Sequence, residues 1–202
     1  GWLCGCTIVG AEQYSKLEAD ILECLELLYE EELEKEARDA SYSEYYAVMS
    51  HRYPKNHEVQ SFYALALLGS VEDGRDVEVY GEAGKIAAQI VKENPQHPGA
   101  LHYMIHAYDD PDHATLAMEA AQTYAQVAPS ASHALHMPSH IFVAQGMWDA
   151  VIYSNIDSYQ ASVDRMVVKG LDNDARGYHA YHWLQYGYLQ KGEFEKAAAM
   201  ID

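Results

Sequence analysis

The chain has 202 residues, of which 49% are hydrophobic and 22% charged, a balance typical of one folded unit rather than a disordered chain. Lys and Arg total 13 against 31 Asp and Glu, so the net charge is −18, and this field excludes nucleic acid as a partner because it repels phosphates. The longest apolar runs, such as residues 63–69, are far shorter than the roughly 20 residues of a membrane span, which excludes a membrane partner.

The two ends of the sequence look cut. The chain begins at Gly1 rather than Met and stops at Asp202 inside an apparent helix, so we expect a single domain, 1–202, truncated at both ends. Residues 2–10 do not form a signal peptide, and the localisation stays open with the cytoplasm favoured. We interpret Cys4, Cys6 and Cys24 as ordinary thiols; a metal or redox role for Cys4 and Cys6 is the alternative.

Apolar residues three and four positions apart recur along the chain, whereas strand patterns are almost absent. The first helical segment is expected at 17–33. Ser41 and Glu44 have the spacing of a capping box that opens a second helix, and Tyr53-Pro54 closes it. Further helices are expected at 57–69, 80–93, 99–108, 115–127, 134–145, 148–168 and 178–190. The sequence therefore predicts an all-α protein.

The helical part of the sequence repeats itself. Pro95 and Pro129 are 34 residues apart, and the same shift aligns residues 100–102 with residues 134–136. A period of 34 is the spacing of the tetratricopeptide repeat (TPR). Residues at the marker positions of that repeat also fall in register: Tyr188, Gly192, Phe194 and Ala197, and less fully Phe142, Gly146, Trp148 and Val151.

On these residues the chain resembles the TPR-like superfamily, and the resemblance implies a right-handed α-solenoid of antiparallel helix pairs. Irregular repeats are expected at about 98–131, 132–177 and 178–202, with helical pairs before them. Gly146 and Gly192 are 46 residues apart, so about 12 extra residues lie between these units. The runs 106–111 and 133–142 are similar to a group of bacterial TPR-like proteins, a resemblance that implies no activity.

Histidines gather on one face of the repeats. His102 and His106 are four residues apart and project from one side of a helix; His136 and His140 repeat this pair 34 residues later. The TPR register places further ring side chains in the same concave groove: His133, His179, His182 and Tyr186. Seven of the 11 histidines therefore share this predicted groove.

A transition metal accounts for this pattern in one interpretation. Neutral imidazole is a common ligand of zinc, copper, nickel and iron, and a pair at i and i+4 presents two nitrogens to one ion. Asp109 offers a carboxylate on the same helix face as His106. His102 and Asp109 are about 10 Å apart along the helix axis, too far to bind one ion easily. We therefore favour a site made of His106, Asp109 and a histidine of the next helix. The predicted metal ligands are His102, His106, His136, His140 and Asp109.

Pro138 tests this geometry, because proline removes a helical hydrogen bond except in the first turn. A helix that begins near Ala134 tolerates it. If the helix begins at Pro138 instead, we expect His136 to leave the shared face.

Two alternatives to a metal stay open: histidines that hydrogen-bond one another as structure, and direct binding of a peptide or small anion. We interpret His51, His57, His97 and His113 as surface or capping residues. The function that we favour is a scaffold with a peptide, protein or small-molecule ligand in the groove, since solenoids expose extended surfaces. The alternative is a metal-dependent hydrolase or oxidoreductase; common enzyme motifs are absent, and no catalytic residue or oligomeric state is assigned.

Overall fold

The computed structural model describes residues 14–201, and in that range the chain forms helices and turns without a β-strand. The α-helices are α1 (Lys16–Leu27), α2 (Lys35–Arg52), α3 (His57–Gly69), α4 (Val77–Glu93), α5 (Pro98–Ala107), α6 (Met118–Val127), α7 (Ser132–His136), α8 (Pro138–Ala144), α9 (Trp148–Lys169), α10 (Tyr178–Gln190) and α11 (Phe194–Ala198). Two short 3-10 turns, η2 (Ala114–Ala117) and η3 (Asn173–Ala175), precede α6 and α10. The prediction of an all-α protein is confirmed.

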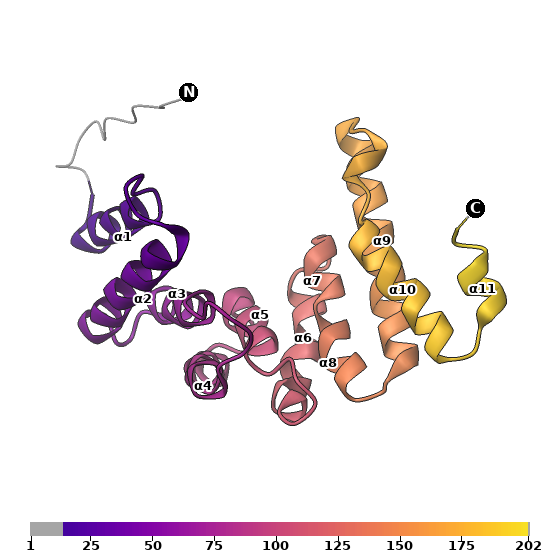
Figure 1. The fold of residues 1–202 in the computed structure, drawn as a ribbon, viewed down its shortest axis with the longest axis horizontal. Coiled ribbons are helices and arrows are strands. Elements are labelled where there is room, and N and C mark those ends of the chain that lie inside the picture. Colours follow the sequence, from indigo (N-terminus) through magenta and orange to yellow (C-terminus); the bar gives the residue numbers. More distant parts are fainter. Residues whose placement is uncertain (1–13, 202) are drawn as a thin grey trace.

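The helices follow one another in a curved row from the N-terminal to the C-terminal end (Figure 1). Most helices pack mainly on their neighbours along the sequence, whereas α7 packs mainly on α9, and α5 also contacts α3 and α8. Contacts that pass from each hairpin to the next are the signature of a solenoid. Side chains on α5, α7, α8 and α10 are thereby brought together although they are far apart in the sequence.

The core between these helices is built largely from small side chains. Leu101, Ile105 and Ile141 are fully buried together with a series of alanines. A Cβ atom on Gly84 would clash with the ring of Tyr108, so α4 and α5 can approach this closely only with glycine there.

Two glycines end equivalent helices of the repeat. Gly146 and Gly192 have φ angles of 66° and 74°, in the left-handed region that favours glycine. They follow α8 and α10 and allow the chain to turn back into α9 and α11. The two marker glycines of the sequence pattern therefore have the same conformational role.

The capping box expected at Ser41 and Glu44 is wrong. Helix α2 already begins at Lys35, and the hydroxyl of Ser41 donates to the carbonyl of Ala37 at 2.9 Å, a bond that a serine makes inside a helix. A capping box is found instead before α1, where Ser15 and Glu18 satisfy each other's backbone N–H groups. Helix α1 ends at Leu27, earlier than the apolar spacing predicted.

The single helix expected at 134–145 is divided into α7 and α8, because Pro138 has no N–H to donate; it is the first residue of α8, where proline is tolerated. Met137 keeps helical angles of −51° and −37°, so the chain continues in nearly the same direction. His136 therefore stays beside His140, and the loss expected from a helix start at Pro138 does not occur.

Cys24 is a buried free thiol, and burial raises its pKa to about 12, so it stays protonated. Cys4 and Cys6 lie outside the described residues. Between residues 14 and 201, no helix is both long enough and apolar enough to cross a bilayer.

Candidate metal centre

The histidines of four helices form two groups of three. The first trio is His102 and His106 of α5 with His133 of α7. The second trio is His136 of α7 and His140 of α8 with His179 of α10. Within each trio, one nitrogen from every ring lies within 4.8 Å of the other two. Each group thus combines a pair at i and i+4 with one ring from a later helix.

In the second trio, hydrogen bonds behind the rings fix which nitrogens carry protons. Nδ1 of His136 lies 2.6 Å from Oδ1 of Asn155, whose amide nitrogen donates to the carbonyl of Val151 at 2.8 Å. Because that bond orients the amide, Oδ1 faces the imidazole and Nδ1 of His136 must be the donor. Nδ1 of His140 likewise donates to the carboxylate of Asp109 at 2.7 Å.

The Nε2 atoms of His136 and His140 consequently face each other as acceptors. They lie 3.1 Å apart, and two unshielded lone pairs at this distance repel unless a proton or a metal ion lies between them. Two imidazole nitrogens bound to tetrahedral zinc at about 2.0–2.1 Å lie about 3.3 Å apart. The observed spacing therefore fits two nitrogens of one metal site.

Desolvation favours the neutral, ligating form of His136 and His179. Desolvation lowers the pKa of His136 to about 4, the bond to Asn155 opposes the shift, and the nearby His140 adds to it. Partial desolvation lowers the pKa of His179 as well, although the residue is exposed overall. The indole of Trp183 closes one side of the trio, with ring centroids 5.0, 4.5 and 5.9 Å from those of His136, His140 and His179.

The first trio is arranged around His102, whose Nε2 lies 3.0 Å from Nε2 of both His106 and His133. Tyr103 and Tyr124 stack on its ring, each with centroids 5.4 Å away. Desolvation lowers the pKa of His102 to about 3, and the neighbouring imidazoles contribute. Within the described residues, no hydrogen bond holds Nδ1 of these three rings, so an Nε2–H tautomer can satisfy the cluster without a metal.

The four histidines predicted as ligands are divided between two groups, with His102 and His106 in the first trio and His136 and His140 in the second. Asp109 stands behind His140 and belongs to neither trio. Of the predicted groove residues, His133 and His179 each complete a trio. His182 is exposed outside both trios, and Tyr186 is 44% exposed with its ring against Trp148 at 5.8 Å.

Sequence reasoning missed Trp183 and Asn155. Trp183 lies four residues after His179 on α10, and this spacing alone indicates that the two share a face. Asn155 lies on α9, 19 residues after His136, and no local spacing connects them. His97 is a capping residue as predicted, since its Nδ1 accepts from the N–H of Ala100, but it is buried rather than on the surface.

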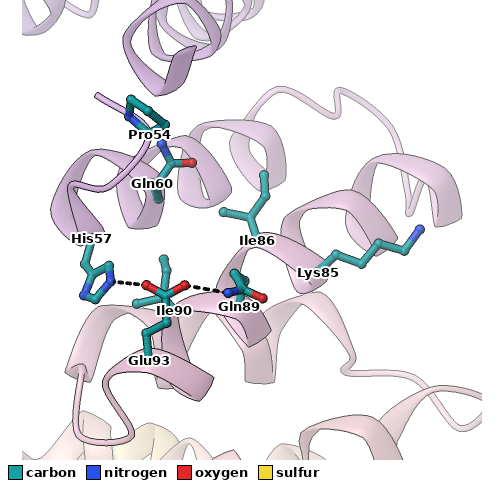
Figure 2. Close-up of a pocket in the computed structure, with 8 residues that line it drawn as sticks. All are labelled: Pro54, His57, Gln60, Lys85, Ile86, Gln89, Ile90 and Glu93. Carbon is teal, nitrogen blue, oxygen red and sulfur yellow. Dashed lines mark hydrogen bonds and ion pairs between the residues drawn. The ribbon is translucent and has the colours of Figure 1, made fainter. Parts of the chain in front are cut away.

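Two pockets differ in their relation to the trios. One, of about 360 Å³, adjoins the first trio and is lined by Leu65, Leu68, Gly69, Arg75, Tyr80, His106 and Asp109. The other, of about 280 Å³, lies between α3 and α4 (Figure 2). There Glu93 accepts from His57 at 2.9 Å and from Gln89 at 2.5 Å, so these three side chains of the pocket satisfy one another.

These features define a helical-repeat solenoid with a histidine array along successive hairpins. No family model and no curated protein matches the chain. Among solved structures it is similar to MamA 41-end from Desulfovibrio magneticus RS-1, with a TM-score of 0.69, 12% identity, and coverage of 93% of this chain and 92% of that one. The MamA RS-1 ArsTM double mutant gives the same TM-score and coverage at 11% identity. The likeness confirms the fold, a TPR-like right-handed α-solenoid.

Proposed function

We propose that this chain is a TPR-like scaffold that binds a partner and holds a divalent transition-metal ion at the second trio. The observation that supports the metal is the pair of facing Nε2 atoms in His136 and His140, since both rings have their protons engaged on the opposite side. Imidazole ligands oriented by amides or carboxylates behind them are the usual form of a histidine metal site. Asp109, predicted as a ligand, takes the orienting role in this proposal.

The ligand set narrows the metal to those that accept imidazole nitrogen, namely zinc, copper, nickel or iron. Three nitrogens from His136, His140 and His179 leave one position of a tetrahedral site open. A donor side chain of a peptide or protein partner, or a small-molecule ligand, would bind there. The extended surface of a solenoid suits such a partner, which supports a scaffold.

A metal-dependent hydrolase or oxidoreductase is the second candidate. The open coordination position favours it, because a metal ion with an open position can bind and polarise a substrate. The pocket of about 360 Å³ is lined by His106 of the first trio and by Asp109, which stands behind His140, so it borders the histidine array without including a ligand of the second trio. Metal-dependent turnover of a simple ester, absent in a variant without the second trio, would favour the enzyme. No turnover with metal bound would favour the scaffold.

The first test is elemental analysis of tag-free protein purified without added metal or chelator. We expect near-stoichiometric zinc, copper, nickel or iron, and its loss in a His179→Ala variant. His179 is exposed, so this change removes a ligand without opening a cavity. The control is His182→Ala, an exposed histidine of the same helix outside the trio.

No metal in the purified protein, and none retained after incubation with Zn²⁺ and desalting, would contradict the metal site. Metal retained equally by His179→Ala and the wild type would place it elsewhere.

A further inference from the structure

The first trio repeats the design of the second. His136 and His140 lie 34 residues after His102 and His106, which is the period of the repeat. His179 lies 46 residues after His133, the same separation as that between Gly146 and Gly192 in these units. Each trio therefore takes the same three positions, two from one unit and one from the next.

We infer that the first trio is a second metal site, which takes up a divalent transition-metal ion more weakly than the second trio. This inference rests on the proposed function of the second trio. The two rings that neighbour His102 place their Nε2 atoms 3.0 Å from its own, as close as the pair in the second trio. Three nitrogens thus converge at both positions.

The trios are close to each other yet separate. The centroids of His106 and His140 are 6.3 Å apart, and those of His133 and His136 are 6.5 Å apart. Across the trios, no group of four ligand atoms between residues 14 and 201 meets the 4.8 Å spacing found within each trio. Two ions with three nitrogens each fit this arrangement better than one ion shared by all six rings.

The weaker binding follows from what lies behind the rings. His136 and His140 are held by Asn155 and Asp109. Within residues 14–201 no such hydrogen bond holds the Nδ1 atoms of the first trio, and tyrosines stack on the ring of His102 instead. Outer partners of this kind change metal affinity by about 10–100-fold. An ion already in the second trio also repels a second cation at short range. We therefore expect the first trio to bind about 10–100-fold more weakly.

Within residues 14–201 the array consists of two trios, and the sequence of the following unit gives the reason. In the following unit His182 takes the place of His136, but Tyr186 takes the place of His140. A neutral phenol is a poor metal ligand compared with an imidazole. The unit that follows therefore has one imidazole, His182, at the two positions where each trio has a pair.

The test is titration of the metal-free protein with Zn²⁺, followed by isothermal calorimetry and native mass spectrometry. We expect two ions in the wild type with affinities that differ about 10–100-fold. His133→Ala should keep only the tight site, and His179→Ala only the weak one. Both histidines are exposed, so the two variants are matched, and circular dichroism should show equal helicity.

The fluorescence of Trp183 separates the sites independently, because its ring contacts the second trio. Ni²⁺ at the tight site should quench it in the wild type and in His133→Ala, with no such quenching in His179→Ala. Trp183→Phe identifies the signal among the three tryptophans.

One tight ion in the wild type, unaffected by His133→Ala, would overturn the second site and leave the proposed function standing. One ion lost in both variants would mean a single shared site and also overturn it. No Zn²⁺ bound by any form would remove the proposed function as well.

Discussion

The two trios occupy the same positions of the repeat but differ in what supports their rings. Behind His136 lies Asn155, and the residue 34 positions before that asparagine is the buried Ala121, whose side chain cannot accept a hydrogen bond. Tyr124 stacks on His102, whereas Ser158 stands 34 residues later and donates to the carbonyl of Ser132. The positions of the candidate ligands are therefore the same in both trios, whereas residues that differ between the repeats determine how firmly each ligand is held.

The largest expected effect is the loss of stability of the metal-free protein in acid. Burial lowers the pKa of His136 from 6.5 to about 4 in the folded state, so the unfolded chain takes up this proton first as the pH falls. Stability should therefore be constant above about pH 6.5 and decrease toward pH 4, by on the order of 3 kcal/mol for this ring alone. Urea unfolding at a series of pH values measures it.

The matching variant is His136→Asn, which should reduce that pH dependence by the share of this ring, while His102, whose pKa is lowered to about 3, keeps its own share. The exposed His182→Asn should leave the dependence unchanged. A wild-type slope in His136→Asn would show that this ring does not cause the acid sensitivity.

The next effect concerns a ligand that only the second trio uses. His140→Ala removes one nitrogen of the tight site and should weaken Zn²⁺ binding there by at least about 100-fold, since losing a ligand is more damaging than losing its outer partner. Binding at the first trio should change little. His182→Ala is the control, and a tight site that survives His140→Ala would break the assignment of this ring.

The smallest expected effect concerns the carboxylate of Asp109, which orients the ring of His140. Asp109→Asn keeps an acceptor for His140 but removes the charge, and Zn²⁺ affinity at the second trio should fall about 10-fold while the first trio is unchanged. Asp112→Asn removes an equal charge from a nearby exposed position and controls for the general field. Equal losses in the two variants would mean that the carboxylate acts only through the net charge.

Much of the fold followed from local spacing. Apolar residues three and four apart predicted the helices, and the period of 34 predicted the TPR-like solenoid, because both patterns repeat along the chain. The errors were at boundaries, where competing local bonds decide. Ser41 resembled a cap but bonds back within α2, and Pro138 divided one expected helix into two.

The pair of His102 and His106 could be predicted from the sequence, since a separation of four residues within one helix fixes a shared face whatever the helix packs against. The pair of His136 and His140 was predicted in the same way, but it depends on the helical angles of Met137, which keep α7 and α8 nearly in line. Only the tertiary structure decided which third ring joins each pair and what lies behind it. His133, His179 and Asn155 reach the pairs across helix interfaces whose geometry depends on packing and on the length of the intervening segments. That information is distributed over many contacts, so no local pattern in the sequence carries it.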